Sequence, residues 1–183
     1  MTDEKSLVYY FDIDGVLLDL SFSFSKFAQL HYPLATDESD WREIWNQFLV
    51  SEDSSSLPAL VNVAKFNAFS RKNDICLITG FPEAHAPKRI ANLGKHGIEY
   101  GKLLFVPTAN KADFIFRKSA RRQVIYIEDD PAPLLQLGEL LPSSKLYQFC
   151  LPGGSYQHAA PLIMVNSWED FWVSANRGHS LAD

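Results

Sequence analysis

The feature that most constrains this chain is an apolar run that ends on two closely spaced carboxylates. Residues 7–13 are rich in β-formers, and the run delivers Asp12 and Asp14 with Gly15 directly after them. Such a run is typical of a strand covered on both faces. Side chains alternate along a strand, so both aspartates would face one side if the strand continued. Two like charges held that close require a positive group between them, and a divalent cation is the simplest one.

Apolar runs and helical patterns alternate along the rest of the chain. The expected strands are residues 7–13, 74–79, 103–106, 123–128, 145–150 and 162–165. The expected helices are residues 21–32, 39–51, 57–72, 82–96, 110–119 and 134–141, with a last helix opening at Ser167 and a polar loop at 51–56. This alternation predicts an α/β protein, a three-layer α/β/α sandwich around a mostly parallel sheet.

Three of the expected strands end in residues with chemical capability. Asp12 and Asp14 end the first strand, Thr79 ends the second, and Glu128 with Asp129 ends a later one. In open parallel sheets the ligand site lies beyond the carboxyl ends of the strands. The sequence therefore predicts that these side chains meet at one edge of the sheet.

These strand ends, taken with Lys111, resemble the four motifs of the haloacid-dehalogenase-like superfamily. The motifs lie in the order typical of that superfamily and cover most of the chain, residues 7–141. Asp14 is typical of its phosphatases and not of its dehalogenases. The Thr-Gly-Phe-Pro turn at 79–82 and the acidic pair before Pro131 also resemble the 5′(3′)-deoxyribonucleotidase branch. A nucleotide monophosphate is therefore the first substrate hypothesis.

The resemblance implies a role for each motif residue. Asp12 would be the nucleophile that forms an aspartyl-phosphate, and Asp14 would be the general acid and base. Thr79 and the backbone N–H of Gly80 would hold phosphoryl oxygens, while Lys111 would neutralise the developing charge. Lys102 is the alternative for that lysine role, but it precedes a strand, whereas Lys111 begins a helix.

The resemblance also implies a Mg²⁺ cofactor, since that ion takes hard oxygen ligands and keeps several waters. Asp12, Asp14 (through its backbone carbonyl) and Asp129 would be the metal ligands. Glu128 would orient Lys111 or a metal-bound water, although an aspartate is commoner at its position. Asp130 is the alternative metal ligand to Asp129.

The position of the helices between the first two motifs predicts the domain organisation. Residues 1–18 and 74–183 are expected to form the core, and residues 19–73 a small helical cap insertion with a return helix. In the superfamily, caps at this position cover the active site and select substrates. The hypothesis from sequence is therefore a Mg²⁺-dependent phosphomonoester hydrolase acting on a small phosphorylated substrate.

Two other classes of function stay open at this point. A phosphotransferase or mutase would keep Asp12, Asp14 and the metal but exclude water, and a non-enzymatic interaction protein would keep only the fold. The net charge of −5 argues against a general nucleic-acid binder. The start of the chain lacks a signal-peptide pattern, and no apolar stretch approaches the ~20 residues of a membrane span. We therefore expect a cytoplasmic protein with no membrane partner.

Overall fold

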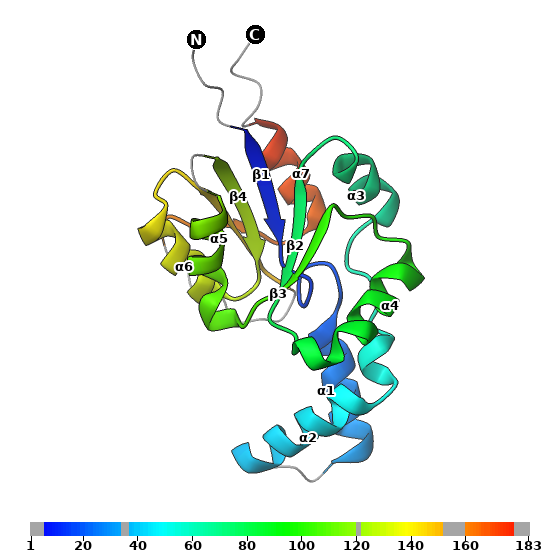
Figure 1. Cartoon of the computed structure of the whole chain (residues 1–183). Helices are drawn as coiled ribbons and strands as arrows, with labels where there is room; N and C mark the ends of the chain where they lie inside the picture. Colours follow the sequence, from blue (N-terminus) through cyan, green and yellow to red (C-terminus); the bar gives the residue numbers. More distant parts are fainter. Residues whose placement is uncertain (1–5, 34–36, 120–121, 152–159, 178–183) are drawn as a thin grey trace, which may run out of the picture.

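A computed structural model describes residues 6–33, 37–119, 122–151 and 160–177. Its centre is a six-stranded sheet in the order β3-β2-β1-β4-β5-β6, in which every neighbouring pair is parallel. The strands are β1 (Leu7–Phe11), β2 (Ile75–Thr79), β3 (Lys102–Phe105), β4 (Gln123–Glu128), β5 (Lys145–Phe149) and β6 (Ile163–Val165). The predicted α/β class with a parallel sheet is confirmed (Figure 1).

Seven α-helices and three short 3₁₀ turns are present in the described part of the chain. The helices are α1 (Leu20–His31), α2 (Glu38–Val50), α3 (Val63–Ser70), α4 (Ala86–His96), α5 (Lys111–Lys118), α6 (Pro131–Leu140) and α7 (Trp168–Arg177). The 3₁₀ turns are η1 (Asp53–Ser55), η2 (Glu83–His85) and η3 (Thr108–Asn110). None of these helices is long and apolar enough to cross a membrane. Residues 1–5, on which the expectation about a signal peptide rests, lie outside the described residues.

The two faces of the sheet carry different cores. On one face Phe11 packs between α3 and α7, with ring centroids 5.4 Å from Phe66 and 5.8 Å from Trp168. On the other face α5 and α6 bury apolar residues such as Ile115 and Leu137 against the strands. Trp168 also donates a hydrogen bond of 3.1 Å to the carbonyl of Val16. The helix α7 therefore fixes the loop that follows the two aspartates.

The helices α1 and α2 extend beyond the carboxyl ends of the strands (Figure 1). They pack against each other through aromatic rings, with Phe24 lying 5.3 Å from Trp45 and 5.4 Å from Phe48 between centroids. Asp19 and Asp37 cap the two helices by accepting backbone N–H groups. The division at residues 19–73 and the role of these helices as a substrate-selecting cap stay predictions.

The third helix begins later than predicted. A helix was expected from residue 57, but α3 starts at Val63, capped by Asn62. The preceding segment instead runs beside the loop after β1, where Asp19 N–H donates to Pro58 O (2.9 Å) and Leu60 N–H to Leu17 O (2.8 Å). These hydrogen bonds to the core loop use the N–H and carbonyl groups that a helix would have needed.

Two shorter segments also differ from the prediction. The predicted polar loop at 51–56 contains the turn η1, where Ser54 is fully buried and its hydroxyl donates to Leu49 O (3.1 Å) and Ser51 O (2.9 Å). The helix predicted over 82–96 is divided into η2 and α4, and it ends as predicted on a left-handed Gly97. The turn η1 is held by hydrogen bonds of the Ser54 side chain, and such bonds leave no periodic pattern in the sequence. This is why the sequence analysis did not predict η1.

Candidate functional site

A cavity of about 200 Å³ opens at the carboxyl ends of β1, β2 and β4. Its polar lining is Asp12, Asp14, Gly80, Thr108, Lys111, Glu128, Asp129 and Asp130. Its apolar lining is Leu20 from α1, Trp45 from α2 and Phe81 after β2. The sheet therefore brings the predicted acidic strand-end residues Asp12, Asp14, Glu128 and Asp129 to one cavity, and the helices α1 and α2 contribute Leu20 and Trp45 to its lining.

Two glycines allow the polar groups to approach one another. Gly15 has a φ of +87°, and a Cβ there would lie 2.2 Å from Asp129 Oδ2. A Cβ on Gly80 would lie 2.3 Å from the hydroxyl oxygen of Thr108. A side chain at either position would displace a site residue. Gly15 therefore lets the loop after Asp14 approach Asp129, and Gly80 lets the segment after Thr79 approach Thr108.

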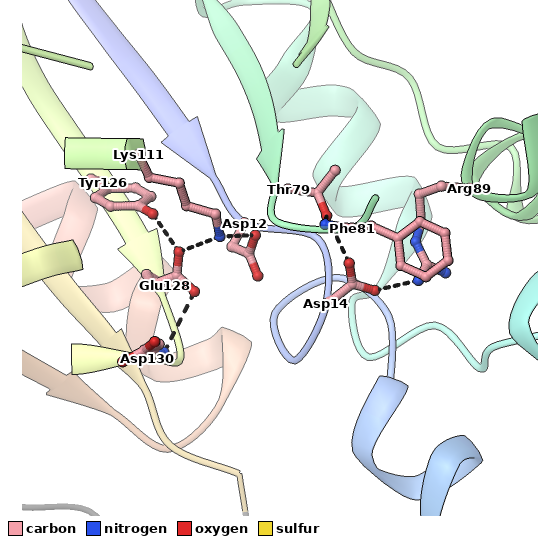
Figure 2. Close-up of polar contacts among 9 residues, drawn as sticks. All are labelled: Asp12, Asp14, Thr79, Phe81, Arg89, Lys111, Tyr126, Glu128 and Asp130. Atoms are coloured by element: carbon pink, nitrogen blue, oxygen red, sulfur yellow. Dashed lines mark hydrogen bonds and ion pairs between the residues drawn. The ribbon is translucent and has the colours of Figure 1, made fainter. Parts of the chain in front are cut away.

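Lys111 is the centre of the first polar network of the site (Figure 2). Its ammonium donates to Asp12 Oδ1 (2.6 Å) and to Glu128 Oε2 (2.7 Å). The hydroxyl of Tyr126 also donates to Glu128. Burial by itself would lower the pKa of Lys111, but attraction from the two carboxylates outweighs it and raises that pKa. The lysine is therefore a permanent cation beneath the cavity.

Two buried carboxylates, Asp12 and Glu128, and the partly buried Asp129 form an acidic cluster beside this lysine. Asp12, Glu128 and Asp129 each offer an oxygen, and these oxygens lie within 4.8 Å of one another. Burial raises the pKa of Glu128 to about 7, against the opposing charge of Lys111. Burial and then the charge of Asp12 raise the pKa of Asp129 to about 6. The cluster has more negative charge than Lys111 neutralises, so a divalent cation fits it.

The other two predicted metal residues lie differently. The carboxylate of Asp14 is not part of the acidic cluster. Asp130 caps α6, where its Oδ1 accepts the N–H of Ala132 at 2.9 Å. This helix-capping contact engages one oxygen of Asp130, which favours Asp129 as the ligand, and the ligand set stays a prediction.

Asp14 belongs to a second polar network on the other side of the cavity (Figure 2). Its Oδ2 accepts a hydrogen bond of 2.8 Å from the hydroxyl of Thr79, and its Oδ1 lies 2.7 Å from Nη2 of Arg89. The Thr79 hydroxyl in turn accepts the N–H of Phe81 at 2.9 Å. Burial raises the pKa of Asp14, and the Arg89 charge opposes that rise. The two motif aspartates therefore occupy separate hydrogen-bonded environments.

The lysine alternatives are distinguished by position. Lys102 lies at the start of β3 and lines a separate cavity with Val8 and Asp74. Lys111 begins α5 and reaches Asp12 directly. A parallel strand places its first residue at the edge opposite to the site, which explains why Lys102 is remote.

Thr79 is placed differently from the role that the resemblance implied. Its side chain is fully buried and does not line the cavity, whereas Gly80 does. Both hydrogen bonds of its hydroxyl go to protein groups, Asp14 and Phe81. A direct contact between the Thr79 hydroxyl and a phosphate stays a prediction, and the observed contact is with Asp14.

The sequence analysis missed Arg89 and Thr108. Arg89 lies in an amphipathic helix among other basic residues, where an arginine normally faces solvent, so its sequence neighbourhood carries no signal. Thr108 precedes Lys111 by three residues in η3, and its hydroxyl lies beside Gly80 at the cavity. A polar residue in a loop after a strand end was the available signal for Thr108.

The raised pKa values predict an unusual pH dependence of stability. Burial raises the pKa of Glu128 from its ordinary value of 4.5 to about 7 in the folded protein. The folded protein therefore binds more protons than the unfolded chain between these values, so the free energy of unfolding falls as pH rises through them. Without divalent cations, we expect Glu128 to contribute about 3 kcal/mol below pH ~4.5 that is lost by pH ~8.

Denaturant unfolding in EDTA at pH 5 and pH 8, for the wild type and Glu128→Gln, measures this contribution. The loss of stability toward pH 8 should be smaller in Glu128→Gln, because the glutamine has no proton to lose. Mg²⁺ should stabilise the wild type more at pH 8 than at pH 5, since protons compete with the metal. Identical pH profiles for the two proteins would contradict the burial argument.

Comparison with known proteins gives a fold without a sequence family. No protein-family model matches the chain, and no curated protein matches it in sequence. Solved structures do match. The magnesium-bound HAD-hydrolase YfnB from Bacillus subtilis has a TM-score of 0.62 and 10% identity, over 94% of this chain and 99% of that one.

Two further matches show how varied the chemistry on this fold is. A protein assigned as a β-phosphoglucomutase from Thermotoga maritima has a TM-score of 0.57 and 15% identity, over 92% of this chain and 98% of that one. The L-2-haloacid dehalogenase from Xanthobacter autotrophicus has a TM-score of 0.54 and 9% identity, over 78% of this chain and 76% of that one. The chain thus has the fold of the haloacid-dehalogenase-like hydrolases.

Proposed function

We propose that this chain is a Mg²⁺-dependent phosphomonoester hydrolase that works through an aspartyl-phosphate on Asp12. The observation that carries the proposal is the contact of the buried Asp12 carboxylate with the Lys111 ammonium at the floor of the cavity, 2.6 Å apart. A carboxylate nucleophile needs such a cation beside it, because the phosphate that it attacks is also an anion.

The proposed reaction uses the two aspartates in turn. A carboxylate oxygen of Asp12 bonds to phosphorus while the bond from phosphorus to the ester oxygen breaks, and that oxygen takes a proton from Asp14. Asp14, now a carboxylate, then accepts a proton from water, and the water oxygen attacks phosphorus. The bond between phosphorus and Asp12 breaks, which releases phosphate and restores both aspartates.

The separation of the two aspartates supports this division of roles. In phosphoryl transfer the attacking and leaving oxygens lie roughly in line on opposite sides of phosphorus. Asp12 and Asp14 line the same cavity but belong to networks on opposite sides of it (Figure 2). Lys111 and the N–H of Gly80 would hold the phosphoryl oxygens between them, and the Thr108 hydroxyl offers a further donor.

Three carboxylates would hold the metal. Asp12, Glu128 and Asp129 present hard oxygens, the ligand type that Mg²⁺ requires. Burial, followed by the charges of neighbouring carboxylates, raises the pKa of each of them. When bound, the cation would offset the repulsion between the nucleophile and the phosphate. Glu128 also accepts the hydrogen bond from the Lys111 ammonium, at 2.7 Å.

The apolar wall of the cavity guides the substrate proposal. Leu20, Trp45 and Phe81 line the same cavity as the acidic residues and suit a flat, partly apolar leaving group. A nucleoside monophosphate meets that description, and so do other small phosphorylated metabolites. We propose a small substrate in the cytoplasm, with α1 and α2 acting as the cap that selects it.

Phosphate release from p-nitrophenyl phosphate tests the proposed activity. We expect turnover with Mg²⁺ that is abolished by EDTA and restored by added Mg²⁺.

The structural likeness to a protein assigned as a β-phosphoglucomutase makes phosphoryl transfer the second candidate function. Mg²⁺-dependent transfer to a sugar phosphate with little hydrolysis would identify that activity. A lack of both reactions across a panel of phosphorylated metabolites and nucleotides would contradict the proposal.

A further inference from the structure

Arg89 is a fully buried arginine that the reaction described above does not use. It lies on α4, and its side chain is 0% exposed. Burying a guanidinium requires a partner charge, and Asp14 is the only carboxylate within ion-pair distance among the described residues. The charge of Arg89 is thus paired with that of one site residue, Asp14.

The guanidinium is held in place on three sides. Its Nη2 lies 2.7 Å from Asp14 Oδ1, and its Nη1 donates to the carbonyl of Ser54 at 3.3 Å. The guanidinium carbon lies 3.9 Å from the ring centroid of Phe81, in a cation–π contact. These contacts, from the turn η1 and the segment after β2, leave the arginine little freedom to follow Asp14 into another rotamer.

Asp14 is consequently fixed at both oxygens. Arg89 holds Oδ1 and Thr79 holds Oδ2, so rotation of the carboxylate would break both contacts at once. The fixed carboxylate lies on the side of the cavity away from Asp12 and Lys111 (Figure 2). For an in-line displacement at Asp12, that side is where the leaving oxygen emerges.

We propose that Arg89 is a positioning residue that holds Asp14 at the leaving-group side of the cavity. The inference rests on the proposed hydrolase function and names the group that sets the geometry of its proton transfer. Among the described residues that line the cavity or form the acidic cluster, Arg89 is not found, so its proposed effect passes through its ion pair with Asp14.

The neighbouring Lys88 provides a matched control. Its ammonium donates to Ser51 O (2.6 Å) and to the hydroxyl of Ser54 (3.3 Å), so it also connects α4 to η1. Within the described part of the chain, no hydrogen bond or ion pair joins Lys88 to Asp14, whose partners are Thr79 and Arg89. A purely structural role in attaching η1 is therefore shared by both residues, whereas positioning of Asp14 belongs to Arg89.

The experiment compares two esters that differ in their need for a proton. The leaving group of 2,4-dinitrophenyl phosphate departs without protonation, whereas that of an alkyl phosphate requires it. We expect Arg89→Met to lower kcat/KM for the alkyl ester about 10²-fold and that for the activated ester less than about threefold. Arg89→Lys should recover part of the loss, and Lys88→Met should leave the ratio of the two esters at the wild-type value.

A double variant shows whether Arg89 acts through Asp14. Asp14→Asn combined with Arg89→Met should match Asp14→Asn alone, because the positioned group is already gone. The double variant also removes both charges of the ion pair. It therefore keeps the test valid if circular dichroism shows that the single variant Arg89→Met does not fold. Multiplicative losses in the double variant would overturn the inference.

The outcomes separate the inference from the proposed function. Wild-type protein that hydrolyses both esters, with Arg89→Met slowing both equally, would overturn the positioning role alone. Wild-type protein inert toward both esters in Mg²⁺ would overturn the hydrolase proposal and this inference with it. A selective loss on the alkyl ester, shared by Asp14→Asn, would support both.

Discussion

Replacing Asp12 by asparagine is expected to lower kcat for phosphate release by about 10³-fold or more. The amide has nearly the shape of the carboxylate but does not form the covalent intermediate. Asp12 is buried beside Glu128 and its pKa is raised, first by burial and then by that neighbour. Removal of its charge therefore also removes a repulsion, and we expect the variant to fold.

The measurement is p-nitrophenyl phosphate hydrolysis in Mg²⁺, with acid-quenched wild-type protein analysed by mass spectrometry for phosphate bound to the peptide that contains Asp12. Asp74→Asn is the matched control, since Asp74 pairs with Arg122 at the opposite edge of the sheet. It should keep wild-type turnover. An Asp12→Asn protein that turns over at the wild-type rate would disprove the nucleophile assignment.

Lys111→Met is expected to reduce the free energy of unfolding by about 3–5 kcal/mol near neutral pH. The lysine is the shared partner of Asp12 and Glu128, and all three side chains are at most 3% exposed. Methionine fills the volume but leaves two buried carboxylates without a cation. The penalty should shrink as pH falls, because the raised pKa values let both carboxylates take up protons.

Urea unfolding at pH 5 and pH 8 measures this effect. Lys118→Met is the control on the same helix, because Lys118 is exposed. Its effect should stay within about 0.5 kcal/mol. The addition of Glu128→Gln to Lys111→Met should restore part of the stability. A loss for Lys111→Met that equals the loss for Lys118→Met would show that the buried ion pairs contribute little.

The acidic residues of the site could be located from the sequence because two simple features of a parallel sheet determine where they lie. Apolar runs without alternation identify the strands of a parallel sheet, and the carboxyl ends of such strands meet at one edge. Asp12 and Glu128 therefore had to lie near each other, as the pairing of Phe11 with Ile127 in β1 and β4 shows. Lys111, in a helix, was identified only through its resemblance to a known motif.

The partners of Asp14 could not be found in the same way. Arg89 lies 75 positions further along the chain, on a helix whose pattern shows only that one face is apolar. Whether a helix residue near the boundary of that face is buried depends on the angle at which the helix crosses the sheet. The contact with Ser54 further depends on η1, which forms through side-chain anchoring and has no periodic signature.

The sequence alone determined the parallel sheet, the strand ends that carry acid and the two aspartates that open the site. Local periodicity and the alternation of side chains fix these features before any long-range contact forms. The tertiary structure alone decided that Asp12 and Asp14 lie in separate networks, one around Lys111 and the other around Arg89 and Thr79. The reason is that a charge in a protein interior takes its partner from whichever element packs against it, and that packing is a property of the whole fold.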